Sequence, residues 1–259
     1  MKVSIVTAVL NSPEIVRRQV LHYNRMDLPP SVELIIVDDG SEPPLKVDIR
    51  PNFKLRIYET NDKRPWTQPA ARNIGSRRAR GEYVIFADID HIISKEVIEV
   101  AMNATADVIR FKRELAVLNG DGEFTQSWDV LKAWGCTRGK LGIAPHGNSY
   151  IFKRSLYVAL DGVDERFVGT GKYPNREEVP LKRKLKALGD NITIIDDSSK
   201  PTIYMFPNGK YCGDKDANPF GFFHSLSRER HIGRKTNKQI HRDRKERRDV
   251  RSKHNNPSS

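Results

Sequence analysis

The sequence predicts an α/β fold in which a mostly parallel sheet is covered by helices on both faces. Apolar runs rich in β-branched residues are separated by helical segments that carry start and stop signals. The runs are continuously apolar rather than alternating, so each strand is expected to be buried on both faces. The predicted strands cover residues 2–10, 32–40, 54–59, 82–88, 191–196 and 202–206.

Proline and capping residues mark the starts of the predicted helices, and glycines mark several ends. Ser12 is expected to cap the helix that Pro13 opens, and Ser94 to cap a later one. Gly81 is expected to end a helix by adopting the left-handed conformation. The predicted helices cover residues 13–26, 69–81, 94–104, 153–162 and 180–189, whereas residues 111–150 are expected to be rich in loops.

The length and composition are those of one large domain with a tail. The chain has 259 residues, of which 37% are hydrophobic, and this is ample for a core. Its two cysteines, Cys136 and Cys212, suit a reducing compartment, although one disulfide stays open. No run approaches the roughly 18 apolar residues of a membrane span, and residues 1–13 resemble a first strand more than a signal peptide. We therefore expect a cytoplasmic protein, at most peripheral at a membrane.

The net charge is concentrated at the C-terminus. Residues 228–259 contain 12 Lys and Arg against 4 Asp and Glu, out of a total charge of +12. Such a segment buries too little apolar surface to offset its ordering entropy. We expect residues 238–259 to be a disordered tail, either a solvated end or an arm that contacts nucleic acid, another polyanion or an anionic membrane.

Polar residues follow the predicted strands where those strands end. Thr7 lies toward the end of the first strand, and Asp38 and Asp39 lie at the end of the second. Asp88 and Asp90 lie at the end of the strand at 82–88, and Asp196 and Asp197 end the strand at 191–196. Ligands bind beyond the carboxyl ends of open parallel sheets. Clustered carboxylates cost several kcal/mol per ion unless a cation is present, and oxygen ligands suit Mn²⁺ or Mg²⁺. The alternative is structural, with an aspartate that caps the helix beginning near Ser94.

Four blocks of the sequence, in order, point to one family. Residues 3–41 ("VSIVTAVLN…VELIIVDDGS") and 71–90 ("ARNIGSRRARGEYVIFADID") resemble family 2 glycosyltransferases of the Rossmann-like GT-A fold. Residues 146–171 are similar to the segment of those enzymes, and of β-1,4-galactosyltransferases, that leads to the catalytic acid. Residues 222–231 resemble a galactosyltransferase segment with a late metal-binding histidine.

The resemblance implies one GT-A domain over residues 1–237. Its nucleotide-binding half would cover residues 1–110, and its acceptor and catalytic half residues 111–237. The implied activity is that of an inverting hexosyltransferase, which moves a sugar from a nucleotide-sugar donor to an acceptor hydroxyl on a glycan or other molecule. Among donors the resemblance favours a UDP-sugar.

The resemblance also assigns the donor site. Asp90 would bind the Mn²⁺ or Mg²⁺ that bridges the donor diphosphate, and His224 would complete the metal shell. His91 is an alternative ligand because it adjoins Asp90.

The remaining donor-binding residues are implied in the same way. Asp39 would accept a hydrogen bond from the nucleobase, and Thr7 and Ala8 would line that pocket. Arg72 would lie near the base or the diphosphate, and Asp88 would contact the ribose or orient the site.

The catalytic acids implied by the resemblance are Glu177 and Glu178. They fit the family's acidic pair, although several residues are inserted after Gly171 and a glutamate stands where an aspartate is usual. Pro180 places both at the N-terminal end of a helix, where the dipole favours the ionised form that a base requires. Glu178 is the expected base, and Glu177 is expected to hold the acceptor.

Other classes remain open. A catalytically inactive GT-A-like module that binds nucleic acid or another polyanion through its basic tail is the main alternative. A sugar-nucleotide pyrophosphorylase would need a glycine-rich phosphate loop after the first strand, and residues 7–13 contain no glycine. A haloacid-type phosphatase usually carries its nucleophile on the first strand, whereas this Asp-x-Asp follows a later one.

Overall fold

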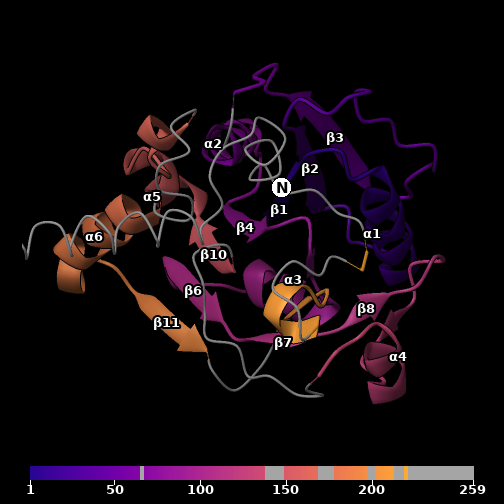
Figure 1. The fold of residues 1–259 in the computed structure, drawn as a ribbon. Helices are drawn as coiled ribbons and strands as arrows, with labels where there is room; N and C mark the ends of the chain where they lie inside the picture. Colours follow the sequence, from indigo (N-terminus) through magenta and orange to yellow (C-terminus); the bar gives the residue numbers. More distant parts are fainter. Residues whose placement is uncertain (65–66, 138–148, 169–177, 198–201, 213–218, 221–259) are drawn as a thin grey trace, which may run out of the picture.

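The fold is built on a seven-stranded sheet (Figure 1). The computed structural model describes residues 1–64, 67–137, 149–168, 178–197, 202–212 and 219–220. The strand order is β11-β6-β10-β4-β1-β2-β3, and β10 is antiparallel to both neighbours whereas the other pairs are parallel. The strands are β1 (Val3–Val9), β2 (Val32–Asp38), β3 (Lys54–Glu59), β4 (Tyr83–Ala87), β6 (Val108–Phe111), β10 (Tyr150–Lys153) and β11 (Ile194–Asp197). The predicted α/β class with a mostly parallel sheet is confirmed.

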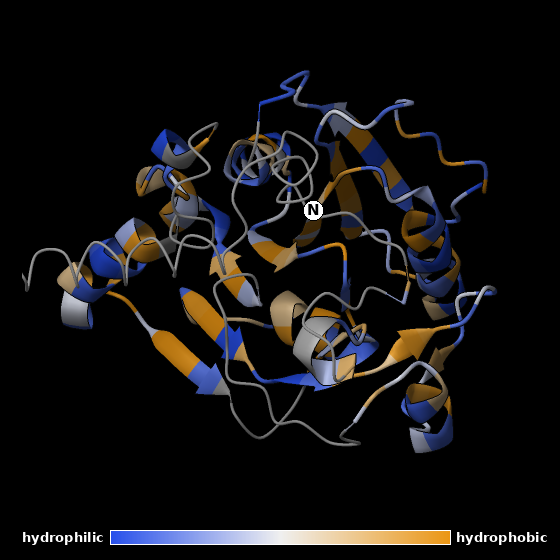
Figure 2. Ribbon diagram, viewed as in Figure 1, coloured by the Kyte–Doolittle hydropathy of each residue, from blue (hydrophilic) through white to orange (hydrophobic). Residues whose placement is uncertain are grey.

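Helices cover both faces of this sheet. One hydrophobic cluster joins the sheet to α1 (Pro13–Met26) and α3 (Lys95–Met102). A second cluster joins the other face to α2 (Gln68–Arg78), α5 (Arg154–Ala159) and α6 (Glu178–Leu188). Helix α1 carries both apolar and polar residues (Figure 2), as expected for a helix that packs one face on a sheet.

Successive side chains of β1 face opposite sides of the sheet, and both sides are covered by helices, which explains why the strands are continuously apolar. Val3, Ile5 and Val9 belong to the cluster under α1 and α3, whereas Val6 and Ala8 belong to the cluster under α2. Every residue of β1, β2 and β4 is buried, and β3 at the sheet edge is partly exposed. Burial on both faces is therefore confirmed for the three central strands.

The strand at 202–206 does not join the main sheet. It forms β12 (Ile203–Met205), which lies between β5 (His91–Ile92) and β7 (Arg113–Leu115) in a separate three-stranded sheet. The main sheet is completed instead by the short strands β6 and β10, which were not predicted. Residues 111–150 also contain the hairpin of β8 (Val117–Leu118) and β9 (Phe124–Thr125), and helix α4 (Trp128–Ala133). Three short turns are 3₁₀-helical: η1 (Glu165–Phe167), η2 (Gly189–Asn191) and η3 (Gly209–Cys212).

Helix α1 covers Pro13–Met26 as predicted, but the predicted roles of Ser12 and Gly81 at helix ends are wrong, and that of Ser94 is confirmed. The Ser12 hydroxyl donates to the Leu10 carbonyl at 2.7 Å and does not cap α1. Gly81 does not adopt a positive φ, and α2 already ends at Arg78. The Ser94 hydroxyl accepts from the Val97 amide, as expected of a cap.

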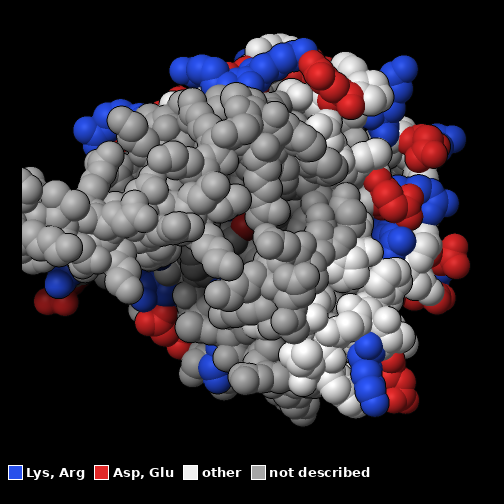
Figure 3. All heavy atoms as spheres, viewed as in Figure 1, with Lys and Arg blue, Asp and Glu red and all other residues white. Residues whose placement is uncertain are grey.

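Two further expectations concern the distribution of charge on the surface and the absence of a membrane span. Basic and acidic side chains are interspersed on the described part of the face in Figure 3, in keeping with 33 Lys and Arg against 29 Asp and Glu before residue 228. Within the described ranges, no helix combines the length and the apolar character needed to cross a bilayer. The tail at 238–259 lies outside the described residues.

Gly81 is needed for a close approach rather than for a turn. Its amide donates to the Ser4 hydroxyl at 2.9 Å, and that hydroxyl donates to the buried Glu33 carboxylate at 2.6 Å. Arg56 pairs with Glu33 at 2.7 Å, which compensates the buried charge. A Cβ on Gly81 would lie 2.6 Å from the Ser4 nitrogen, so the loop before β4 packs directly on the backbone of β1.

We predict that Gly81→Ala lowers the free energy of unfolding by about 1–3 kcal/mol, because the added methyl group would overpack a rigid backbone contact. Urea denaturation measures the change. Gly120→Ala is the matched control, since a Cβ there meets no atom within 4 Å, and it should leave stability within about 0.5 kcal/mol. Equal stability of the two variants would contradict the packing argument.

Candidate active site

The carboxyl ends of three parallel strands meet at one edge of the sheet. Thr7 in β1 is paired with Ile36 in β2 and with Ala87 in β4. The residues that follow these strands therefore gather at this edge, as expected for an open parallel sheet. Thr7 and Ala8 are both buried there.

The two aspartates after β2 have different surroundings. The Asp38 carboxylate accepts the amides of Ser41 and Leu45 at 2.9 and 2.8 Å, so it holds the loop that follows β2. Asp39 is buried, its amide donates to the Val9 carbonyl at 2.7 Å, and its Oδ1 accepts from the Thr60 hydroxyl at 3.3 Å. Asp39 thus lies between the ends of β1 and β3.

Arg72 and Asp88 form a buried ion pair at this edge. The Arg72 Nη2 donates to Asp88 Oδ1 at 2.5 Å, and the two side chains are 6% and 10% exposed. Gln68, one turn earlier in α2, donates to the same oxygen at 2.8 Å. Arg72 is therefore not a solvated helix arginine, and it connects α2 to the end of β4.

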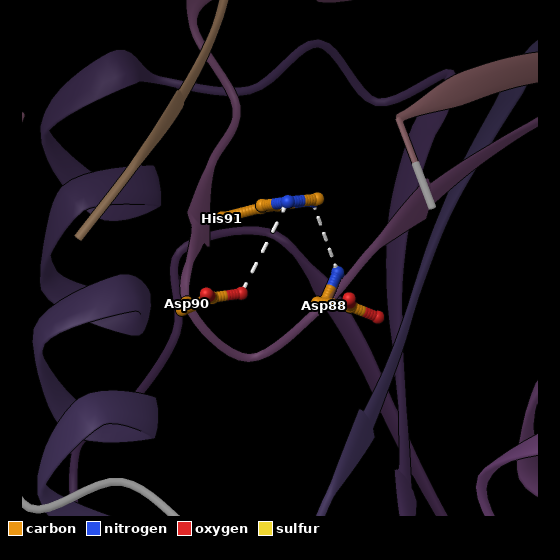
Figure 4. A group of neighbouring side chains, drawn as sticks. All are labelled: Asp88, Asp90 and His91. Carbon is orange, nitrogen blue, oxygen red and sulfur yellow. Dashed lines mark hydrogen bonds and ion pairs between the residues drawn. The ribbon is translucent and has the colours of Figure 1, made fainter. Parts of the chain in front are cut away.

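Residues 88–91 form a turn that is held from three sides (Figure 4). The His91 amide donates to the Asp88 carbonyl at 2.9 Å, and the Asp88 amide donates to His91 Nδ1 at 3.2 Å. Gln19, buried in α1, donates to the carbonyls of residues 89 and 91. The Phe206 amide donates to the Asp90 carbonyl at 2.8 Å. This turn joins the main sheet to β5 in the small sheet.

Asp90 has one engaged oxygen and one that lacks a hydrogen bond. Asn208 donates to Oδ2 at 2.9 Å. Asp90 Oδ1 and His91 Nε2 are buried, and neither has a hydrogen-bond partner in the described part of the chain. They lie 4.0 Å apart, too far for a direct hydrogen bond. Buried polar atoms are rarely left without a partner, so these two atoms mark a place for a ligand.

The hydrogen bond at Nδ1 fixes how His91 can act. Burial lowers the pKa of His91, and this outweighs the opposite effect of Asp90 and Asp88, so the ring is neutral at neutral pH. Since Nδ1 accepts the Asp88 amide, the ring proton lies on Nε2. His91 Nε2 is then a donor toward an oxygen atom rather than a metal ligand.

The arrangement suits a hard cation at Asp90. One ligand atom each from Asp88, Asp90 and His91 lie within 4.8 Å of one another. Two ligands of one Mg²⁺ are at most about 4.2 Å apart, so the three side chains would have to move slightly closer together to share such an ion. The Nε2 proton nevertheless excludes His91 in its present hydrogen-bonded state. Asp90 Oδ1 fits a cation, because it is a buried carboxylate oxygen that has no donor within hydrogen-bond distance among the described residues.

Comparison with known proteins agrees with this geometry. Residues 4–107 match the family described as Glycosyl transferase family 2. Residues 4–107 are therefore similar to family 2 glycosyltransferases, and this similarity covers less than half of the 259 residues. The matched segment contains Thr7, Asp39, Arg72, Asp88 and Asp90, and a search of the curated proteins found no significant match.

Solved structures share the fold. The mannosyltransferase PcManGT from Pyrobaculum calidifontis, in complex with GDP-Man and Mn²⁺, has a TM-score of 0.51 at 17% identity, over 81% of this chain and 58% of that chain. TarS 1-349 from S. aureus, in complex with UDP-GlcNAc, has a TM-score of 0.47 at 20% identity, over 82% and 61%. The similarity to PcManGT confirms the predicted GT-A fold, and the chain spans about three fifths of the length of these structures.

The structure locates only part of the predicted catalytic residues. Helix α6 begins at Glu178, two residues before the start that Pro180 predicted. Glu177 and His224 lie outside the described residues, so their predicted roles remain predictions.

Three residues that hold the site were not predicted: Gln19, Gln68 and Asn208. Gln19 lies on the face of α1 that also carries Val16, Val20 and Tyr23, and a polar residue on an apolar face is a signal that the sequence does contain. Asn208 follows β12 in a segment that resembles an ordinary turn, and its contact with Asp90 depends on the small sheet.

The described part of the chain also has a pocket that is not lined by the predicted donor-binding residues. It has a volume of about 350 Å³ and lies between α2, the turn after α5 and α6. Its charged lining consists of Arg77, Asp161, Asp164, Glu165, Arg166 and Lys184. Asp164 accepts from Arg166 and Glu165 accepts from Arg77, so these charges largely pair with each other.

We predict that Arg72→Ala lowers the free energy of unfolding by about 3 kcal/mol or more, because it leaves the Asp88 carboxylate buried without its cation. Guanidinium denaturation measures the change. Arg77→Ala, on the same helix, removes an exposed pair with Glu165 at 3.2 Å and should have less than about 1 kcal/mol of effect. Similar losses in the two variants would show that the buried pair has no special weight.

Proposed function

We propose that the protein transfers a sugar from a nucleotide-sugar donor to an acceptor hydroxyl, with Mn²⁺ or Mg²⁺ held at Asp90. The observation that carries this proposal is the unpartnered, buried Oδ1 of Asp90 at the carboxyl edge of a GT-A sheet. A carboxylate oxygen in this position needs a cation or a donor, and no described residue supplies one.

The surrounding residues suit the two ends of a nucleoside diphosphate. Asp39, Thr7 and Ala8 are buried at the same edge, where the carboxylate can accept from a nucleobase. The Nε2–H of His91 lies 4.0 Å from Asp90 Oδ1, and it can donate to a phosphate oxygen bound next to the cation. A bound divalent cation would stabilise the charge of the departing diphosphate.

The role of Arg72 follows from its partner. Its ion pair with Asp88 holds the carboxylate on the α2 side of the turn, while Asn208 holds Asp90 from the small sheet. Arg72 and Asp88 would then orient the donor site, and the positive charge of Arg72 would favour a diphosphate nearby.

For the chemical step we propose inversion, with Glu178 as the base. A base at the first residue of α6 benefits from the helix dipole, which favours the carboxylate. Glu178 would remove the proton of the acceptor hydroxyl, and Glu177 would hold the acceptor. No covalent intermediate is required.

A donor panel tests the proposed function. UDP- and GDP-hexoses are incubated with the protein and Mn²⁺, and the free nucleoside diphosphate and product masses are followed with and without a chelator. We expect release with at least one donor, UDP-sugars first, and loss of release when the cation is removed. The fold does not choose the nucleotide, since a mannosyltransferase with the same fold was solved with GDP-Man.

The charge of +8 in residues 228–259 supports a second proposal, contact with a polyanion or an anionic membrane. Such binding would weaken steeply with salt and would be lost on truncation after residue 237. If truncation removes only this binding, the segment is a docking arm of a peripheral cytoplasmic enzyme. If the panel shows no transfer and only this binding remains, the protein is an inactive module.

We predict that Asp90→Ala weakens Mn²⁺-dependent binding of the donor nucleotide by more than about 10-fold, because even indirect changes at metal sites typically cost about 10–100-fold. Calorimetry with UDP and GDP, each with and without Mn²⁺, measures the effect. Asp190→Ala, at an exposed residue of η2, is the control. Undiminished binding by Asp90→Ala would place the cation elsewhere.

We predict that Glu178→Gln lowers kcat for transfer by about 10²–10⁴-fold and leaves donor binding unchanged, because a base acts only on the way to the transition state. Glu177→Gln should mainly raise the KM of the acceptor. Steady-state transfer with a donor identified by the panel separates the two effects. Near-normal transfer by Glu178→Gln would exclude it as the base.

A further inference from the structure

The fold brings together the two cysteines of the chain, Cys136 and Cys212, which are far apart in the sequence. Cys136 follows α4, and Cys212 ends the η3 turn. The amide of Thr137 donates to the carbonyl of Tyr211 at 3.1 Å. On the other side of Cys136, a Cβ built on Gly135 would lie 4.0 Å from the Cβ of Cys212. The two backbone segments are therefore in direct contact around the cysteines.

The two thiols are also near neighbours. Cys212 raises the pKa of Cys136, and Cys136 lowers that of Cys212 against the larger effect of burial. Cys136 is buried, whereas Cys212 is partly exposed. Cys212 is thus the more exposed of two adjacent cysteines.

We propose that Cys136 and Cys212 form a reversible disulfide that fastens α4 to the η3 turn. The oxidant is a small disulfide such as glutathione disulfide. The Cys212 thiolate attacks one of its sulfurs, forms a mixed disulfide and releases one glutathione thiolate. The Cys136 thiolate then attacks the Cys212 sulfur and releases the second. Two electrons pass from the protein thiols to the oxidant, and the two protein protons leave with the glutathione products.

The environment of the thiols sets the order of these steps. Burial raises the pKa of Cys136 to about 12, and burial also raises the pKa of Cys212. Both are mainly protonated at neutral pH, so exchange is slow. Cys212 is the first nucleophile because it is the more exposed cysteine.

The disulfide would act next to the candidate active site. The Tyr211 amide donates to the Asn208 carbonyl at 3.0 Å, and the Asn208 side chain donates to Asp90. A covalent bond at Cys212 fastens the turn that directly follows Asn208. The proposal concerns the cysteines alone, and it does not depend on glycosyl transfer.

Peptide mapping of the full chain tests the disulfide. The protein is equilibrated with glutathione disulfide, free thiols are alkylated, and tryptic peptides are identified by mass. The cysteines fall in separate peptides, AWGCTR (133–138) and YCGDK (211–215). We expect these peptides to be linked within one chain, with loss of both thiols, and to separate on reduction. Two alkylated cysteines, or links only between chains, would overturn the proposal.

Single variants test the order of the steps. Cys136→Ser should accumulate the glutathione adduct on Cys212. Cys212→Ser should leave Cys136 at least about 10-fold slower to react, because its sulfur is buried. Equal rates at the two cysteines would reject Cys212 as the accessible nucleophile.

Thermal melting provides a readout that does not depend on how fast the single-cysteine variants react. Oxidised wild-type protein should melt on the order of 5–10 °C above the reduced form, since a disulfide restricts the unfolded chain. The double Cys→Ser variant should melt at one temperature under both conditions. Identical melting of oxidised and reduced wild-type protein would reject the fastening role.

Discussion

The buried ion pair of Arg72 and Asp88 is the interaction on which the candidate site depends. It joins the end of β4 to the middle of α2, with a distance of 2.5 Å between Arg72 Nη2 and Asp88 Oδ1. Asp88 begins the turn that carries Asp90 and His91, so this contact fixes where the turn starts, and Gln19, Phe206 and Asn208 hold its later residues. A carboxylate at the end of a buried strand is tolerated here because one guanidinium and one amide compensate it.

Asn73, the next residue of α2, connects this helix to α5 and to the turn that follows α5. Asn73 donates to the Val163 carbonyl at 2.9 Å and accepts from the Tyr157 hydroxyl at 2.8 Å. A Cβ on Gly162 would lie 2.3 Å from the Asn73 oxygen, so the turn after α5 is built directly on this side chain. Arg72 and Asn73, consecutive residues of α2, thus hold the turn at Asp88 and the turn after α5.

The parts that sequence predicts well are those that local pattern determines. Strands such as β1 and β2 are recognisable because burial on both faces requires a continuous apolar run, and Asp88 and Asp90 stand out because they end such a run. Gln19 and Asn208 could not be paired with the turn, because their contacts depend on how α1 and β12 pack. For the same reason the sequence does not show that strand 202–206 belongs to the small sheet, because its apolar run suits the main sheet equally well.

The antiparallel strand β10 has an evolutionary consequence. The chain leaves the sheet at the end of β6 and returns through Tyr150, which pairs with Arg110 near that same end. Both attachment points of residues 112–149 therefore lie at the edge that carries Asp88 and Asp90. An excursion anchored in this way can be lengthened, shortened or replaced without changing the order of the strands. The strand ends that carry Asp88 and Asp90 can thus stay the same while this segment diverges.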